Sequence, residues 1–292
     1  MVDALIDDYF HSPEGIEFCA RYRAAWSTAD TNLSTTVIES DWARTHITCA
    51  GDANDDAILL LSGSGATSAA WAHAVGPLTK AGYQVIAPDI PGEPGLSVRH
   101  EALAAVPDLS AWLGDLLDQM RIRRVTLVGH SYGAMVATAC AVGHPERVAK
   151  LVLLDPNSVF SPIAPRAALR AIPLLCKPNG RRLRSFYNWE TRGVALDPTW
   201  MYLAEYAADS FPARRPLVPR KLDLARLNIL AQPVSVILAE HSRYHDPKKV
   251  YRAVLDVVPT AHVVTIAGAS HHMLPLQPAP DVNNAIMAAL DG

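Results

Sequence analysis

The sequence predicts an α/β protein in which a mostly parallel, doubly wound sheet carries an inserted helical cap. From residue 57 onward, short and almost continuously apolar runs alternate with helix-forming segments. Strands of this kind are buried on both faces, and their alternation with helices is typical of parallel βαβ units. One stretch, residues 156–232, has no clear strand-like run and is interrupted by prolines and arginines. We therefore expect a core domain of residues 1–155 and 233–292, with residues 156–232 as its cap.

The predicted elements follow in chain order. A helix over 14–27 comes first. Before the cap, the apolar pattern then indicates strands at 34–39, 43–49, 57–61, 83–89, around Val125–Val128, and at 150–155. Helices are expected between these strands at 68–81, 108–120 and 132–144. After the cap, the pattern predicts strands at 233–239 and 262–267, and helices at 247–257 and 279–290.

Composition and charge exclude several classes of protein. Half of the 292 residues are apolar, which is enough to form one large core. The net charge of −3 gives no basic bias that would indicate binding to nucleic acid. The first residues, MVDALIDDYFHSPEG, carry acids where a signal peptide has an apolar segment, and no run approaches the about 18 apolar residues of a membrane span. The widely spaced cysteines form no C-x-x-C pair and favour reduced thiols in a cytoplasmic protein: Cys19, Cys49, Cys140 and Cys176.

The stretch VTLVGHSYGAMVATACAVGHP, residues 125–145, predicts a nucleophile. Ser131 lies between two glycines, after a strand-like apolar run and before a helix-forming run of small residues. G-x-S-x-G on such a strand-to-helix turn lifts the serine hydroxyl above the sheet edge. The N-terminus of the following helix favours negative charge that develops there. Ser131 is therefore the candidate nucleophile.

Two further segments complete a candidate site, in the chain order that enzymes with this G-x-S-x-G turn use. The loop SGSGATS follows the strand at 57–61, and we expect the backbone N–H groups of Ser64 and Tyr132 to bind an oxyanion there. The segment AGASHHMLPLQPAP follows the strand at 262–267. His271 is preferred over His272 as the general base because it directly follows the small-residue turn.

Together these segments resemble the α/β-hydrolase family, and within it the capped carboxylesterase-like members, over roughly residues 43–290. Besides G-H-S-Y-G, the resemblance rests on APDIPGEPGLS, on the place of the insertion and on GASHHMLPLQPAP. It implies a serine hydrolase that acts on a small acyl substrate through an acyl-enzyme on Ser131. Neither a metal nor an organic cofactor is implied.

The chain departs from the family pattern at three positions. Ser62 replaces the usual histidine before the oxyanion loop, and Ser270 replaces the usual glycine before the base. The third departure matters most, because the run Ala239-Glu240-His241-Ser242 has a serine where the family has its triad carboxylate. That carboxylate fixes the tautomer of the histidine, and its loss can cost about 10⁴ in rate.

Three residues are candidates for the missing acid. Asp155 ends the run KLVLLD, a position that some members of the family use, although an aspartate at a strand end is also a common structural group. Asp246 in HSRYHDP follows the vacant position, but Asp246-Pro247 also looks like a plain helix start. Glu240 lies close to the strand end. We rank Asp155 first, then Asp246, then Glu240.

The remaining histidines and aromatics have simpler interpretations. His130 is expected to pack beside the turn, and His241 and His245 to lie on the surface. The spacing in H-S-R-Y-H-D suits no standard zinc site. Trp200, Tyr202 and Tyr206 are expected to form the packing face of the cap, with one of them lining the substrate pocket as the alternative.

The reaction is left open within a group of related chemistries. Ester, thioester and lactone hydrolysis use the same machinery, while a lyase or cyclase on the same fold and a non-catalytic small-molecule binder are the alternatives. The cap holds twelve lysines and arginines against five acids. This charge predicts either an anionic substrate or an acidic carrier protein as partner, or else simple pairing with the acidic core.

Overall fold

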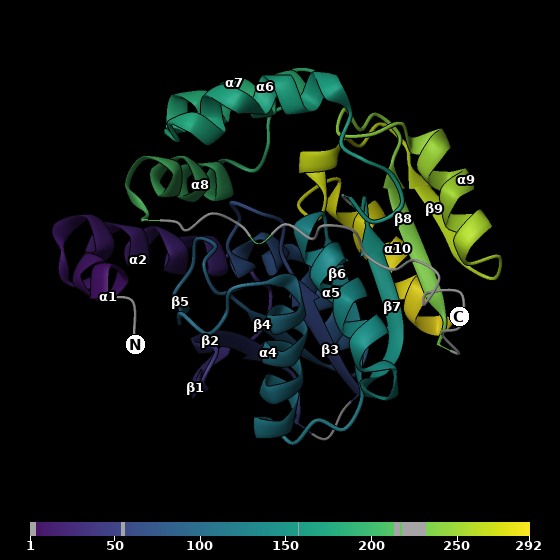
Figure 1. The fold of residues 1–292 in the computed structure, drawn as a ribbon, viewed down its shortest axis with the longest axis horizontal. Helices are drawn as coiled ribbons and strands as arrows, with labels where there is room; N and C mark the ends of the chain where they lie inside the picture. The colour runs from purple at the N-terminus through teal and green to yellow at the C-terminus, as the bar shows by residue number, and fades with distance from the viewer. Residues whose placement is uncertain (1–3, 54–55, 157, 213–216, 218–231) are drawn as a thin grey trace.

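One mixed sheet of nine strands organises the computed structural model, which describes residues 4–53, 56–156, 158–212, 217 and 232–292 (Figure 1). The strand order is β1-β2-β4-β3-β6-β7-β8-β9, and β5 pairs with β2. The strands from β4 to β9 along this order run parallel, whereas β2 is antiparallel to all its neighbours. The strands are β1 (Ser34–Glu39), β2 (Ala43–Ala50), β3 (Asp56–Leu61), β4 (Tyr83–Pro88), β5 (Val98–Arg99), β6 (Val125–His130), β7 (Val148–Leu154), β8 (Val234–Ala239) and β9 (His262–Ile266).

Helices cover both faces of this sheet. The side chains of β3 alternate between two core clusters: Leu59 and Leu61 pack with α4, α5 and α9, and Ile58 and Leu60 pack with α2, α3 and α10. This period of two explains why the central strands are apolar throughout. The helices of the two layers are α2 (Pro13–Trp26), α3 (Ala72–Lys80), α4 (Val106–Gln119), α5 (Tyr132–Gly143), α9 (Pro247–Val257) and α10 (Ala279–Asp291), with short 3₁₀ turns η1 (Ser68–Trp71), η2 (Pro145–Arg147) and η4 (His271–Met273).

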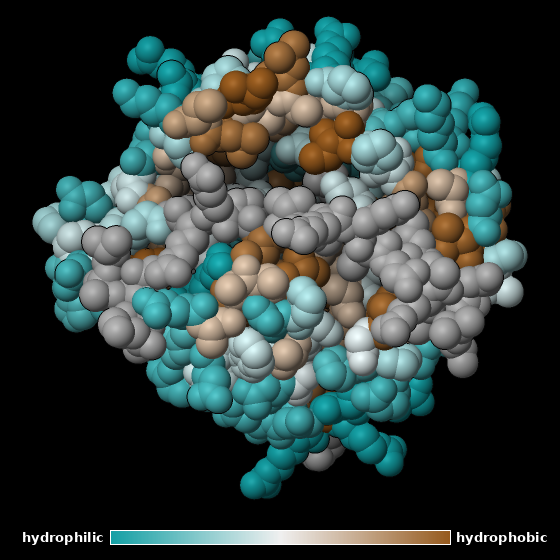
Figure 2. Space-filling model, in the orientation of Figure 1, coloured by the Kyte–Doolittle hydropathy of each residue, from teal (hydrophilic) through white to brown (hydrophobic). Residues whose placement is uncertain are grey.

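A helical insert lies between β7 and β8, above the edge of the sheet where these parallel strands end (Figure 1). It contains α6 (Pro165–Cys176), α7 (Gly180–Glu190) and α8 (Pro198–Ser210). The helices α1 (Ala4–His11) and α2 pack at the end of α8, where Tyr9 of α1 and Phe18 of α2 contact Phe211. Figure 2 shows apolar side chains gathered over the insert, where Leu169 and Leu175 are exposed.

The sequence predicted this architecture closely. Each expected strand lies within two residues of an observed one, and the helical insert occupies the expected place. Two elements were not expected: α1, and β5, whose two residues are too few to give a periodic pattern. Part of the predicted cap, residues 157, 213–216 and 218–231, lies outside the described residues. Among the described helices, none is long and apolar enough to cross a membrane.

Candidate active site

Ser131 stands on a strained turn between β6 and α5. Its backbone has φ 53° and ψ −112°, a conformation that non-glycine residues rarely adopt. The flanking glycines make the turn possible, because a Cβ on Gly129 would lie 2.4 Å from the carbonyl oxygen of Gly133, and one on Gly133 would lie 2.1 Å from that of Leu61. The turn therefore requires both glycines of G-H-S-Y-G and holds the Ser131 hydroxyl above the sheet.

The structure brings three residues predicted from the sequence into one hydrogen-bonded chain. The Ser131 Oγ lies 2.8 Å from Nε2 of His271, and Nδ1 of His271 lies 2.6 Å from Oδ2 of Asp155. All three side chains are buried. Because an ionised carboxylate only accepts hydrogen bonds, His271 carries its proton on Nδ1 and leaves Nε2 free to accept from the serine hydroxyl.

Asp155 is held as a carboxylate by four donors. It directly follows β7 with φ 40°, and its Oδ1 accepts from the backbone N–H of Ala239 at 3.0 Å and from Nε2 of His245 at 2.9 Å. Its Oδ2 accepts from Oγ of Ser242 at 2.8 Å as well as from His271. Burial opposes ionisation, but the charge and hydrogen bonds of His245 and His271 hold the pKa of Asp155 well below its ordinary value.

The other two candidate acids lie elsewhere. Asp246, the alternative acid, begins α9, where its carboxylate accepts from the backbone N–H of Lys248 at 3.0 Å. Glu240 accepts from the backbone N–H of Gly268 at 2.8 Å. Neither carboxylate forms a hydrogen bond with His271 in the described structure. Ser242, at the position where the family pattern has the acid, donates a hydrogen bond to the carboxylate of Asp155 instead.

The expectation that His245 lies on the surface was wrong. This side chain is 1% exposed because the loop after β8 folds back over the end of β7 and brings its imidazole to Asp155. Its Nδ1 is buried without a hydrogen-bond partner in the described structure. His241 is partly exposed, as expected. His130 packs beside the turn, also as expected, with Nε2 3.0 Å from the carbonyl oxygen of His271.

Of the two predicted oxyanion donors, Tyr132 directly follows the serine, and Ser64 lines the same cavity as the serine. Tyr132 is the first residue of α5, and within the described part of the chain neither its N–H nor that of Ser64 donates to a protein acceptor. A Cβ on Gly63 would lie 3.4 Å from Cβ of Ser131, which shows how closely the loop approaches the nucleophile. The oxyanion role of these two N–H groups stays a prediction, and it requires donors of this kind without another acceptor.

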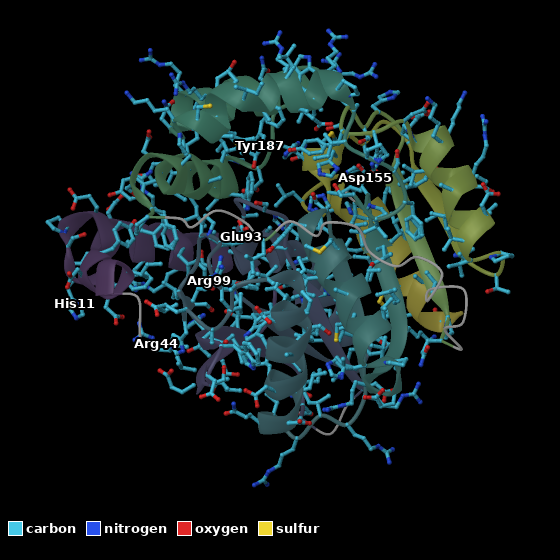
Figure 3. All side chains as sticks on the ribbon, viewed as in Figure 1. His11, Arg44, Glu93, Arg99, Asp155 and Tyr187 are labelled. Atoms are coloured by element: carbon cyan, nitrogen blue, oxygen red, sulfur yellow. The ribbon has the colours of Figure 1, made fainter. Side chains whose placement is uncertain are left out.

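Sequence reasoning missed the buried carboxylate that supports this loop. Glu93, in APDIPGEPGLS, accepts from the backbone N–H of Gly65 at 2.7 Å and from Oγ of Ser64 at 3.1 Å. Burial raises the pKa of Glu93 to about 7, against the lowering effect of these hydrogen bonds. Figure 3 shows Glu93 on the side of the core that faces the helical insert. A glutamate in a glycine-rich loop carries no sequence signal for this contact, because its partner lies 28 residues away.

A second missed carboxylate joins the insert to the segment that carries His271. Glu190, at the end of α7, accepts from the backbone N–H of His271 at 3.1 Å and that of His272 at 3.0 Å, and from Oγ of Ser270 at 2.8 Å. Burial opposes ionisation, but the hydrogen bond and charge of His272 lower the pKa of Glu190 below its ordinary value. Glu190 therefore fixes the backbone on which the candidate base is mounted.

Aromatic side chains enclose a cavity of about 60 Å³ at Ser131. Tyr244 stacks on His271 with ring centroids 4.1 Å apart and an interplanar angle of 14°. Trp200 lines this cavity and also stacks on Tyr187 within the insert, so it has the packing contact that was expected for the cap aromatics. Tyr202 is exposed, and the hydroxyl of Tyr206 donates to the carbonyl oxygen of Glu14. Among the described residues, no group of three or more His, Cys, Asp or Glu side chains is arranged to hold a metal ion.

Comparison with known proteins agrees with this geometry. The chain matches the alpha/beta hydrolase family over residues 58–285. It is 23% identical over 290 residues to the uncharacterized carboxylesterase nap of Bacillus subtilis, covering 94% of this chain and 93% of that protein. A 2-hydroxy-6-oxononadienedioate/2-hydroxy-6-oxononatrienedioate hydrolase of Escherichia coli is 35% identical over 138 residues, a match that spans 44% of this chain and only 48% of that enzyme. The crystal structure of naproxen esterase from Bacillus subtilis superimposes with a TM-score of 0.87 at 23% identity, covering 96% of this chain and 99% of that one.

Proposed function

Because this chain belongs to the α/β-hydrolase family, we propose that it is a carboxylesterase-like hydrolase that uses Ser131 as its nucleophile. The observation that carries the proposal is the hydrogen-bonded chain from Ser131 through His271 to the ionised Asp155. An activated nucleophile of this kind needs a base within hydrogen-bond reach and a third group that orients the base. Both requirements are met in one buried site.

The proposed reaction has two halves. In the first, Oγ of Ser131 attacks the ester carbonyl carbon while Nε2 of His271 takes the hydroxyl proton, and the N–H groups of Ser64 and Tyr132 stabilise the oxyanion. His271 then gives this proton to the leaving alcohol as the bond between the carbonyl carbon and the alcohol oxygen breaks. In the second half, His271 takes a proton from water, which attacks the acyl-enzyme and releases the acid and Ser131.

Asp155 acts in this mechanism without exchanging a proton. Its Oδ2 accepts from Nδ1 of His271 and stabilises the imidazolium that forms at each step. Ser242 and His245 donate to the same carboxylate and hold it in place. We propose these two as the supporting residues that allow the acid to follow β7.

The division into a core and a cap is part of the same proposal. Residues 1–155 and 233–292 are the proposed core with the candidate catalytic groups, and residues 156–232 are the proposed cap, whose described helices are α6, α7 and α8. The aromatic side chains of Tyr187 and Trp200, both from the insert, line the cavity at Ser131. Covering the site in this way excludes water and strengthens the electrostatic interactions within it.

Carboxylic esters are the favoured substrates among the chemistries that the site can support. The relatives that match this chain over most of its length have the names carboxylesterase and naproxen esterase. Thioesters and lactones have the same reacting carbonyl and remain candidates, as does an acidic carrier protein that would deliver an acyl group to the basic cap.

The proposal is tested with a fluorophosphonate probe and with p-nitrophenyl acetate. We expect covalent labelling at Ser131 and ester turnover, both abolished in Ser131→Ala, whose thermal unfolding should match that of the wild type. Ser185→Ala, which changes an exposed serine of α7, is the matched control and should retain both. Labelling without turnover would favour a lyase or cyclase, absence of both would favour a non-catalytic binder, and near-wild-type turnover in Ser131→Ala would refute the assignment.

A further inference from the structure

The side chain of Tyr187 separates two cavities of very different size. The cavity at Ser131 has a volume of about 60 Å³, and a pocket of about 390 Å³ lies within the insert, lined by residues of α7, α8 and the loop that joins them. Tyr187 is the one described residue that lines both. Figure 3 shows it beneath α7, on the side that faces the core. The two spaces therefore meet at this ring.

Neighbouring rings hold Tyr187 in this position. Its ring stacks on Trp200 with centroids 5.8 Å apart and an interplanar angle of 20°, and its centroid lies 4.3 Å from that of His272. Tyr187 is 5% exposed, and its hydroxyl makes no hydrogen bond within the described structure. Burial raises the pKa of this phenol, so it is neutral at physiological pH. The ring itself, rather than a polar contact of its hydroxyl, forms the barrier.

The backbone that carries this ring is fixed to the candidate catalytic segment. Glu190 lies three residues after Tyr187, on the same side of α7, and accepts hydrogen bonds from the backbone N–H groups of His271 and His272. The barrier and the candidate base are therefore mounted on one connected unit. A ring held in this way cannot turn aside without disturbing Trp200 or the segment of His271.

The two volumes indicate what the barrier does. Pockets for small organic ligands usually measure about 300–1,000 Å³, a range that includes the pocket in the insert but not the cavity at Ser131. During the proposed reaction the leaving group must depart while the acyl group stays bound to Ser131, so the enclosed cavity suits the acyl group. We propose that Tyr187 restricts the enzyme to esters of short acyl groups, and that its ring separates the acyl site from the pocket beyond it, which opens to the surface beside the exposed Val194 and Tyr202. This inference rests on the proposed function.

The test compares acyl-length preference in matched variants. The substrates are p-nitrophenyl acetate, butyrate, hexanoate and octanoate, and the measured quantity is the ratio of kcat/KM for octanoate to that for acetate. The wild type should prefer acetate. Tyr187→Ala should raise the ratio by at least about tenfold, because each methylene that gains an apolar site is worth roughly a factor of four. Tyr187→Leu serves as a second opening variant that retains apolar packing in case the alanine variant does not fold.

Two control variants isolate the ring as the cause. Tyr187→Phe keeps the ring and should leave the ratio unchanged. Tyr206→Ala removes a tyrosine from α8 that lines neither cavity, and it should also leave the ratio unchanged. An equal rise in Tyr206→Ala would mean that general loosening of the insert, and not the barrier, sets the preference.

The remaining outcomes distinguish this inference from the proposed function. An unchanged ratio in both opening variants, or a wild type that already prefers octanoate, would overturn the role of Tyr187 while leaving the esterase proposal intact. If the wild type hydrolyses none of these esters, the esterase proposal fails, and binding of octanoate measured by calorimetry decides the inference. If Tyr187→Ala binds octanoate at least about tenfold more tightly than the wild type does, the role of Tyr187 as a barrier is supported, because each methylene that gains an apolar site is worth roughly a factor of four. Equal affinities for octanoate would overturn that role.

Discussion

Replacing Asp155 by asparagine tests the most unusual feature of this site, the acid that follows β7. The carboxylate accepts from four donors, two on each oxygen, and one of them is Nδ1–H of His271. An amide presents one oxygen and one NH₂ group, so at least one donor would face another donor. An NH₂ group directed at His271 would favour the tautomer protonated on Nε2, which cannot accept the proton of Ser131.

The expected loss in kcat is about 10³–10⁴-fold, equivalent to about 4–5.5 kcal/mol of transition-state stabilisation. The assay is initial-rate hydrolysis of a p-nitrophenyl ester, with circular dichroism to establish folding. Asp246→Asn is the matched control, because asparagine caps a helix as well as aspartate does, and it should change kcat by less than about twofold. A variant of Asp155 that retains more than about a tenth of the wild-type kcat, or a larger loss in the control, would refute the assignment.

A double variant extends this test to position 242, where the family resemblance of the sequence places the acid. Oγ of Ser242 lies 2.8 Å from Oδ2 of Asp155, which in turn lies 2.6 Å from Nδ1 of His271. A carboxylate at position 242 is therefore within one hydrogen-bond length of the place that the acid occupies. We expect Ser242→Asp to raise kcat of Asp155→Asn by about tenfold or more, since it restores an acceptor for His271. No recovery would show that the two acid positions are not spatially equivalent in this chain.

Three further predictions follow from the charges around the site. Glu190→Gln should lower kcat by on the order of tenfold or more with little change in KM, because the backbone of His271 loses its anchor; an unchanged kcat in a destabilised protein would limit Glu190 to a structural part. The pKa of Glu93 is about 7 in the folded protein against an ordinary 4.5, so its protonation favours the folded state, and the free energy of unfolding should fall by at most about 3 kcal/mol as the pH rises through this interval. Glu93→Gln should remove that part of the fall in urea unfolding between about pH 4.5 and about pH 7, and parallel profiles in the two proteins would contradict the assignment. If the basic cap attracts an anionic or carrier-bound substrate, kcat/KM for that substrate should drop between about 0.1 M and about 1 M salt while that for a neutral ester stays level, because the Debye length shortens from about 10 Å to about 3 Å; equal responses would exclude steering by the cap.

The local pattern of the sequence was sufficient for most of the fold. The strands of the sheet are apolar because both faces are covered, and Ile58 to Leu61 supply alternate residues to two core clusters. Such runs are visible without knowledge of their neighbours. The turn at Ser131 also has a local signal, because Gly129 is required by contacts with Gly133 and Ala134, although Gly133 is required by Leu61 of the adjacent strand. The sequence analysis did not predict α1 or the two-residue strand β5.

The sequence by itself determined which residues were candidates for the site, and the tertiary structure decided which of them meet. Asp155, Asp246 and Glu240 are all carboxylates near strand ends, and choosing among them requires the position of His271, which lies 116 residues after Asp155. The burial of His245 and the contacts of Glu93 and Glu190 depend in the same way on segments that fold back from far along the chain. A side chain that is buried by a distant segment leaves no periodic signal in its own neighbourhood, because hydrogen bonds and burial depend on distance in space and not on separation in sequence.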